Sequence, residues 1–139
     1  MAVPVWALLG FAVWTLFLLL TTIGVYRWSR ILTGRVQMRE FRADQVEGTD
    51  FYKRAMRAHA NCVENLPIFG AVVLALQASG TSGPLVDRIS LAILGARIVQ
   101  SLIHVGFVQG NTAVLVRFSF FSVQVAGLLW LAGLVVFSG

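Results

Sequence analysis

The chain has few charged residues and a single cysteine. Of its 139 residues, 12% are charged and 58% are hydrophobic, whereas soluble domains carry about 25% charged residues. This composition excludes an ordinary soluble domain, and we interpret the chain as an integral membrane protein. With only Cys62 available, no internal disulfide can form, so cysteine usage does not indicate the redox compartment.

Acidic residues are scarce, with six against eleven lysines and arginines, which gives a formal net charge of +5. Eight of the basic residues lie between Arg27 and Arg57, with four acids among them. The chain lacks the interleaved basic and aromatic residues of a nucleic-acid-binding module, so we expect no nucleic acid partner. The cluster matches the excess of Lys and Arg found in cytoplasmic loops and at anionic lipid surfaces.

Four long apolar runs predict four membrane spans, because a spanning helix needs about 20 residues. The first run has no basic segment before it and exceeds the apolar length of a signal peptide, so we expect it to be retained. We predict an all-α fold, an integral membrane four-helix bundle formed by one domain, residues 1–139. The predicted spans are about 3–27, 55–78, 85–107 and 113–137, with a long connection at about 28–54.

The distribution of arginines also predicts an orientation. The Arg-rich connection belongs in the cytoplasm. Because four spans return the chain to its starting side, both termini should then lie on the opposite side of the membrane. The sequence does not identify which membrane.

A polar stripe enters the second predicted span. At 100° per residue, Arg57, Asn61 and Glu64 fall within about 60° of one another on a helix. Glu64 would lie about 10 Å deeper than Arg57. A carboxylate at that depth should be paired, protonated or functional.

The third predicted span carries a matching stripe, formed by Arg97, Gln100 and His104, also within about 60°. Arg97 would lie roughly 15 Å below the cytoplasmic surface, a depth comparable to that of Glu64. An isolated arginine near the bilayer centre costs about 3 kcal/mol, so the two charges should pair. Such a pair either joins the helices or forms part of a binding site.

The predicted spans carry more hydrogen-bond donors than two carboxylates would need as partners. A surplus of arginine and amide donors that opens to the cytoplasm favours a small, soluble, polyanionic ligand. Glutathione fits this description, although the donors alone do not distinguish it from other small anions. His59 lies about 200° from Arg57 on the helix, so its participation would place the site between subunits. The donors in question are Arg27, Arg57, His59, Asn61, Gln100 and His104.

Three segments resemble the microsomal glutathione transferases of the MAPEG family: RAHANCVEN at 57–65, GAR followed by Ile98 at 95–98, and YRWSR at 26–30. The similarity extends over nearly the whole chain. It implies a homotrimer that binds glutathione as a co-substrate between neighbouring subunits near the cytoplasmic face, with no metal. The glutathione-binding residues implied are Arg27, Arg57, His59, Asn61, Glu64 and Arg97, to which the third-span stripe adds Gln100.

The chain departs from the family pattern at Met56, which replaces the first of two arginines before Ala58-His59, and at two further places that matter more. A tyrosine seven residues after the third-span arginine is replaced by His104, and no arginine stands at 111–113, where the family places the one that stabilises the glutathione thiolate. A thiol is only a few per cent ionised at neutral pH, so a nearby cation is needed. We therefore take Arg117 and His104 as the candidate catalytic residues. The alternative for Arg117 is a snorkelling anchor at the membrane surface.

Three functions remain open. The first is a detoxification enzyme, a glutathione transferase or peroxidase that conjugates a lipophilic electrophile or reduces a lipid hydroperoxide taken from the surrounding membrane lipid. The second is a glutathione- or lipid-binding membrane protein with impaired catalysis. The third is a small-molecule exporter, which is less favoured because its carboxylate must exchange protons, whereas arginines near Glu64 should keep that residue ionised.

Overall fold

The computed structural model describes residues 1–41 and 47–138, so residues 42–46 of the predicted connection lie outside the described part. Four long apolar helical segments run antiparallel, and each is long and apolar enough to cross a membrane. The predicted all-α fold class is confirmed. The spans are Val3–Leu32, Asp50–Ser79, Pro84–Gly106 and Asn111–Ser138.

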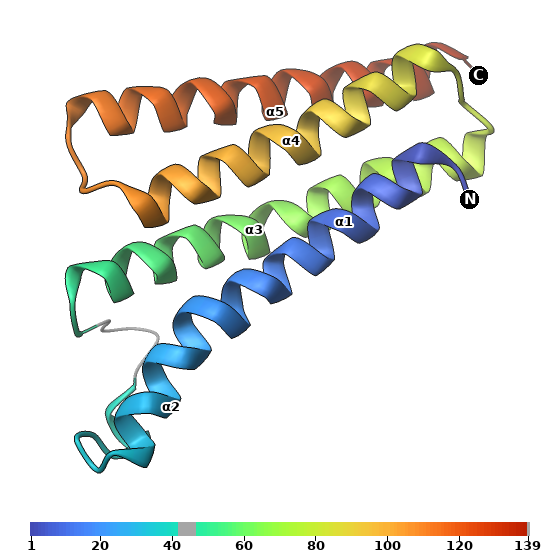
Figure 1. The fold of residues 1–139 in the computed structure, drawn as a ribbon. Coiled ribbons are helices and arrows are strands. Elements are labelled where there is room, and N and C mark those ends of the chain that lie inside the picture. The colour runs from blue at the N-terminus through green and yellow to red at the C-terminus, as the bar shows by residue number, and fades with distance from the viewer. Residues whose placement is uncertain (42–46, 139) are drawn as a thin grey trace.

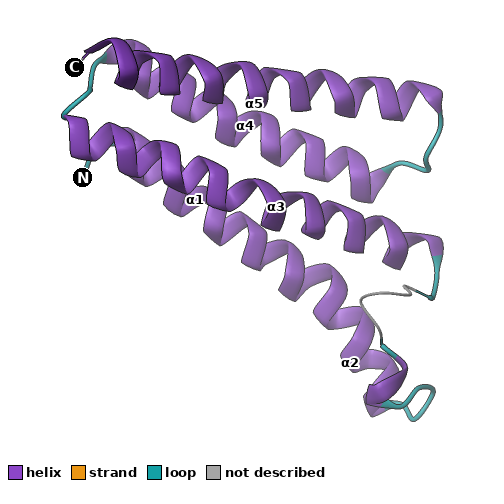
Figure 2. Cartoon of the chain, turned by 180° about the vertical axis from the view of Figure 1, so that it is seen from behind, coloured by secondary structure: helices purple, strands orange, loops and turns teal. Residues whose placement is uncertain are grey.

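The first span consists of three consecutive segments: α1 (Val3–Leu18), the π-helix η1 (Leu19–Gly24) and α2 (Val25–Leu32). A π-helix changes the side of the helix on which the following residues lie. Beyond η1, α2 diverges from the rest of the bundle in both views (Figures 1 and 2). Its side chains contact the beginning of the next long helix, where Arg27 bonds to Tyr52, and the ring of Phe41, over which Arg27 lies at 5.4 Å.

Helix α3 (Asp50–Ser79) has clear signals at both ends. The hydroxyl of Thr49 accepts a hydrogen bond from the Tyr52 amide, and Gly80 ends the helix in the left-handed conformation with φ 68°. One face of α3 carries Cys62 and Phe69, both buried in the bundle core, with Cys62 Sγ 3.4 Å from Ser101 Oγ of α4. The Phe69 ring centroid lies 5.6 Å from that of Phe11. This packing fixes which side of α3 faces the bundle interior.

Helices α4 (Pro84–Gly106) and α5 (Asn111–Ser138) form a hairpin. They approach closely at Gly127, where an added Cβ would lie 3.1 Å from Ile93 Cγ1. Toward the connecting segment 107–110 the two helices diverge (Figures 1 and 2). The hairpin is therefore tight near the chain termini and open at the other end.

Both chain ends lie at one end of the bundle, and residues 33–41, residues 47–49 and the 107–110 turn lie at the other (Figure 1). Hydrogen bonds hold the end that carries the termini, since the Thr81 hydroxyl lies 2.8 Å from that of Ser138. The open end, in contrast, gathers most of the charged side chains. The candidate site lies there.

Candidate functional site

A cavity of about 400 Å³ lies between α3, α4 and α5 at the open end of the bundle. This size falls in the range of small-molecule sites. Its wall combines cationic and amide groups with two aromatic rings on α5. The lining residues are Arg57, Asn61, Gln100, His104, Gln109, Val114, Arg117, Phe118 and Phe121.

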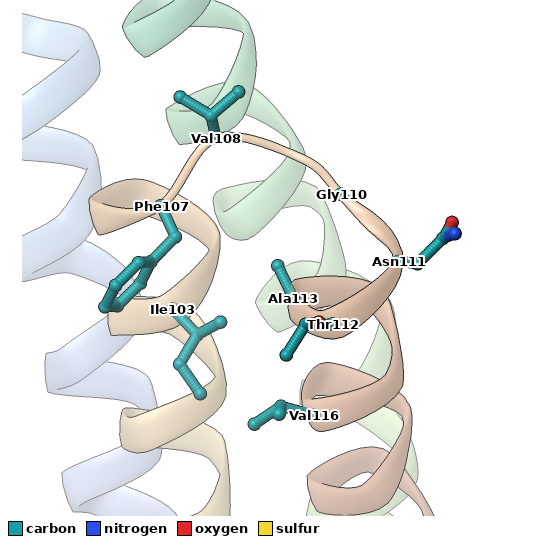
Figure 3. Close-up of a pocket in the computed structure, with 8 residues that line it drawn as sticks. All are labelled: Ile103, Phe107, Val108, Gly110, Asn111, Thr112, Ala113 and Val116. Carbon is teal, nitrogen blue, oxygen red and sulfur yellow. The ribbon is translucent and has the colours of Figure 1, made fainter.

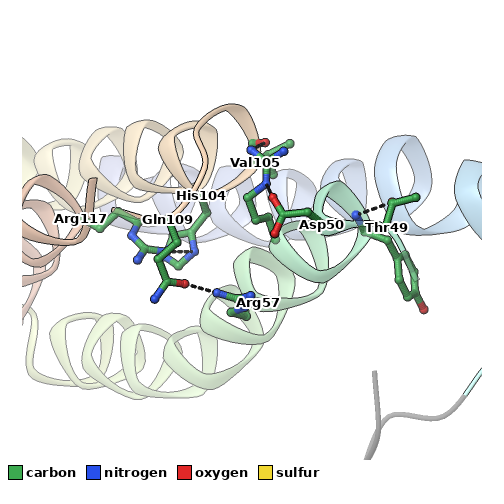
Figure 4. A network of polar contacts seen from close by, with 9 residues as sticks. Thr49, Asp50, Arg57, His104, Val105, Gln109 and Arg117 are labelled. Atoms are coloured by element: carbon green, nitrogen blue, oxygen red, sulfur yellow. Dashed lines mark hydrogen bonds and ion pairs between the residues drawn. The ribbon is translucent and has the colours of Figure 1, made fainter. Parts of the chain in front are cut away.

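Two arginines of α3 bond to the end of α4 and the following turn. The guanidinium of Arg57 donates to the side-chain oxygen of Gln109, and Arg54 donates to the carbonyl oxygen of Val105 at 2.8 Å (Figure 4). Arg54 also forms an ion pair with Asp50 at 2.9 Å. Arg54 thus holds α3 against α4, while the exposed Arg57 stands at the cavity mouth.

His104 lies between two polar neighbours. Nη1 of Arg117, from α5, lies 2.9 Å from Nδ1 of His104 (Figure 4). Nε2 of the same ring lies 3.5 Å from the Asn61 amide nitrogen. That amide nitrogen already donates to the carbonyl oxygen of Arg57 at 3.1 Å. The structure therefore brings the predicted Asn61, His104 and Arg117 together on one wall.

The Arg117 contact determines which nitrogen of His104 carries the proton. A guanidinium has only donors, so Nδ1 of His104 must accept, and the proton of the neutral ring is on Nε2. The Asn61 amide nitrogen, also a donor, lies farther from the ring, at 3.5 Å from Nε2, so we assign the tautomer from the shorter Arg117 contact. The Nε2–H is thus available as a hydrogen-bond donor to a ligand in the cavity.

Gln100 lines the cavity from α4 and is itself held by α5. Its side-chain oxygen accepts a hydrogen bond from Gln124 at 2.8 Å, and both residues are buried. A buried amide pair within a membrane bundle fixes the relation of two helices. Gln100 is therefore positioned by this bond as well as exposed to the cavity.

Arg97 lies deeper than the cavity wall and is only 1% exposed. Its guanidinium carbon is 5.7 Å from the Phe11 ring centroid. Among the described residues, its Nε and Nη2 have no hydrogen-bond partner. A buried guanidinium without acceptors at these two atoms is costly, and the groups that act on its charge are Cys62 and Glu64 of the same subunit.

The predicted pairing of Glu64 with Arg97 is not formed as a direct contact. Glu64 is exposed on α3 and lies within electrostatic range of Arg97. Within the described part of the chain, however, no ion pair of 4.0 Å or less joins them. The two charges act on each other at a distance, and Glu64 remains exposed.

Arg27 and His59 lie on a different side of α3. Nε of Arg27 donates to the Tyr52 hydroxyl at 2.8 Å, and the Tyr52 ring stacks on Tyr26 with centroids 4.2 Å apart. The charge of Arg27 also acts on His59, so the two residues lie within electrostatic range of each other. At 100° per residue, Tyr52 and His59 share a face nearly opposite Arg57. The predicted residues therefore divide between two faces of the subunit.

Two polar residues of the site were not predicted from the sequence. Gln109 lies in a turn, where polar side chains are common, so the sequence does not single it out. Its contact with Arg57 depends on the path of the segment 107–110. Gln124 could have been predicted, because it is a polar residue in an otherwise apolar part of the last span. A buried amide in a span needs a partner, and Gln100 supplies it.

No metal centre is found in the part of the chain that the structure describes, since no three His, Cys, Asp or Glu side chains gather there. The cavity is instead rich in donors. Arg57, Arg97 and Arg117 all lie within electrostatic range of His104. Such a wall is suited to the carboxylates or thiolate of an anionic ligand.

The fold and this cavity define an integral membrane helical bundle with a cationic site at one end. The family model described as "MAPEG family" matches residues 3–137, and the chain belongs to this family of membrane glutathione-dependent enzymes. No curated protein and no solved structure matches the chain. The resemblance seen in the 57–65, 95–98 and 26–30 segments is confirmed.

Proposed function

We propose that the protein is a membrane glutathione transferase that joins glutathione to lipophilic electrophiles, with a glutathione peroxidase activity on lipid hydroperoxides. The observation that carries this proposal is the donor-lined cavity of about 400 Å³. It lies in a chain of a glutathione-dependent family and contains Arg57, Asn61 and Arg117. Arginines bind carboxylates through strong charge-assisted hydrogen bonds, and glutathione has two carboxylates.

We assign the glutathione site to the interface between two copies of the chain, as in a homotrimer. Arg57, Asn61 and Glu64 lie on one face of the subunit, while Arg27 and His59 lie on another. One ligand cannot contact both faces of the same α3. A neighbouring copy that presents Arg27 and His59 to the first face unites them, and it also covers the exposed Glu64 carboxylate, which is unfavourable in contact with lipid.

Within this site, His104 and Arg117 take the catalytic roles. The Nε2–H of His104 donates to the glutathione sulfur, and the positive charge of Arg117 lies directly behind the ring. Donors and cations that favour the thiolate over the thiol increase the fraction of reactive nucleophile. The pair thus takes the place of the arginine that the chain lacks at 111–113.

In both proposed reactions glutathione itself supplies the nucleophile or the electrons. In the transferase reaction the thiol loses its proton to water, the sulfur forms a bond to the electrophilic carbon, and the leaving group departs with its electron pair. In the peroxidase reaction two glutathione molecules supply two electrons, become a disulfide, and reduce the hydroperoxide to an alcohol and water. His104 favours the thiolate in both reactions.

A second candidate is a glutathione-binding protein with impaired catalysis. It is supported by the residues at 111–113, since Asn111, Thr112 and Ala113 offer no cation and line a separate apolar cavity. If this alternative holds, Arg117 serves as a membrane-surface anchor. Glutathione would then bind without turnover.

The experiment that separates these candidates uses the purified protein in lipid nanodiscs. Calorimetry measures glutathione binding, and conjugation to a chlorinated nitrobenzene or reduction of a fatty acid hydroperoxide measures turnover. We expect both binding and turnover, with Arg117→Ala losing turnover and retaining binding. Binding without turnover across electrophiles and hydroperoxides would establish the second candidate, and absence of binding would exclude both.

We further propose that the open end of the bundle, with the Arg-rich connection and the site, faces the cytoplasm. Arg27 and Arg30 flank the span on that side, and Arg30 packs over the Tyr26 ring at 4.2 Å. Both termini lie at the other end (Figure 1). Cytoplasmic loops carry the excess of arginine, and glutathione would enter from the same side.

A further inference from the structure

A second cavity, of about 520 Å³, lies between the end of α4 and the start of α5. Figure 3 shows Ile103 and Phe107 on one side of it and Ala113 and Val116 on the other. The segment 107–110 crosses above them. The lining is almost entirely apolar, in contrast to the donor-lined cavity.

The second cavity results from the shape of the hairpin. Gly127 lets α5 approach α4 closely at Ile93, whereas the helices diverge toward the 107–110 turn (Figure 1). At the wide end the facing side chain on α5 is the small Ala113, which leaves the space between the helices unfilled. A gap in a helix interface loses packing contacts. A ligand that occupied the gap would restore these contacts.

The two cavities lie on opposite sides of the same helix pair. The apolar one is lined by Ile103 and Val116, and the donor-lined one by the adjacent residues His104 and Arg117. The turn contributes to both, with Val108 in the first and Gln109 in the second. Ligands in the two cavities would therefore both border the 107–110 turn, one on each side of the helix pair.

The surroundings of the apolar cavity indicate what enters it. Leu102 and Leu115 beside it are more than half exposed, at 54% and 64%, so this outer surface of the hairpin contacts lipid in a membrane protein. A molecule reaching the cavity from the bilayer is apolar for most of its length. The cavity thus fits an acyl or alkyl chain.

The upper edge of the cavity is different, because α5 begins there. The first backbone bond of this helix runs from the Val114 amide to the Gly110 carbonyl, which leaves the amides of Asn111, Thr112 and Ala113 without acceptors inside the helix. Gly110 has no side chain to cap them. These amides and the positive end of the helix dipole favour a hydrogen-bond-accepting group.

We propose that this cavity binds single-chain lipids that end in a hydrogen-bond-accepting head group, such as a carboxylate or a hydroperoxide, and that it is the entry site of the lipophilic co-substrate. The chain of the lipid lies among Ile103, Phe107 and Val116, and its head group lies at Asn111 and Thr112. The co-substrate role rests on the proposed function. The binding site itself does not.

The first arm of the test measures binding alone. The protein in nanodiscs is photolabelled with palmitic acid that carries a diazirine, and the labelled peptides are identified by mass spectrometry. We expect the label to concentrate on residues 103–116 and to fall about tenfold in Ala113→Phe and in Val116→Phe, which fill the cavity. Leu115→Phe, an equal increase in bulk outside both cavities, is the matched control and should label like the original protein.

The second arm measures turnover. For a long-chain acceptor, Ala113→Phe should raise KM about tenfold, while the KM for glutathione and the rate with a small chlorinated nitrobenzene stay unchanged. Thermal unfolding of each variant establishes that it is folded, and Val116→Phe replaces Ala113→Phe if the latter is not. Unchanged labelling and unchanged KM in a folded filling variant would overturn the inference.

The two arms also separate this inference from the proposed function. Specific labelling that the filling variants abolish, in a protein without turnover, supports the lipid site and refutes the proposed activity. Labelling that a diazirine phospholipid reproduces and free palmitic acid does not displace would identify a bilayer lipid as the occupant and overturn the proposal.

Discussion

Arg117 of α5 holds the imidazole of His104 on α4 through a contact of 2.9 Å between Nη1 and Nδ1. Because the arginine can only donate, it fixes His104 as a donor at Nε2 and prevents Nδ1 from acting as a proton acceptor for a ligand. In the proposed site, His104 would then act as a hydrogen-bond donor, as the hydroxyl group of a tyrosine does. This is a physical reason why a histidine could replace the tyrosine expected at this position from the resemblance.

This relation predicts the outcome of substitutions at position 104. His104→Tyr restores a donor and should retain most of the glutathione-dependent rate. His104→Phe removes the donor and should lower kcat by about a hundredfold, as for loss of one donor to a developing anion. Steady-state kinetics with a chlorinated nitrobenzene measures both. Equal activity of the Phe and Tyr variants would show that no donor is needed at this position.

The protonation state can be observed directly. In protein labelled with ¹⁵N at histidine, the chemical shifts of the two ring nitrogens of His104 should be those of the Nε2-protonated tautomer. Arg117→Ala should remove the preference for this tautomer. Arg117→Lys is the control, since an ammonium group can still donate to Nδ1. A His104 ring protonated at Nδ1 in the original protein would refute the assignment, whatever the activity.

The division of the site between two faces predicts complementation between subunits. Arg27→Gln and Arg57→Gln should each lower turnover strongly, about 10- to 100-fold, because each removes a charged hydrogen bond worth about 1.5–3 kcal/mol. When the two variants are co-expressed, some interfaces pair an original Arg27 from one copy with an original Arg57 from the other. Activity should therefore recover in part.

The control for complementation is the mixture of the two variants purified separately, without exchange of subunits. A glutathione site within one subunit would give no recovery in the co-expressed protein. Crosslinking and mass measurement of the assembly report whether three copies associate. A monomer with full activity would exclude the interface.

The helical periodicity of the sequence predicted much of this site. The spacing of Arg57, Asn61 and Glu64 predicted one polar face, and in the structure Arg57 and Asn61 line the same cavity. The α4 stripe is split, with Gln100 and His104 at the cavity and Arg97 buried beyond it. A helical wheel gives the angle of a residue but not the depth to which a neighbouring helix covers it.

The first span shows another limit of the sequence. The apolar run 1–26 predicts a helix but not its π-helical segment at Leu19–Gly24. Likewise, the predicted pairing of Glu64 and Arg97 assumed that opposite charges at similar depth make contact. Depth alone does not determine the direction of a side chain, and Glu64 is exposed.

The buried amide pair makes a prediction about stability. Gln124→Leu leaves the Gln100 oxygen without its partner and should destabilise the bundle by about 1 kcal/mol. The double variant Gln100→Leu with Gln124→Leu removes both polar groups and should recover most of this loss. Thermal unfolding in detergent measures the three variants. Additive losses would show that the two amides do not interact.

The contact of α5 with α4 at Gly127 makes the last prediction. A Cβ at this position would lie 3.1 Å from Ile93 Cγ1 and 3.3 Å from Ile89 Cγ2, so a larger side chain forces the helices apart. Gly127→Val should cost about 1–3 kcal/mol, seen as a lower unfolding temperature. Gly133→Val is the matched control, because nothing lies within 4 Å of its added Cβ.

Because both cavities depend on the geometry of this hairpin, Gly127→Val should also weaken glutathione binding, whereas Gly133→Val should not. Equal melting temperatures and equal binding in the two variants would show that the hairpin does not depend on this close approach.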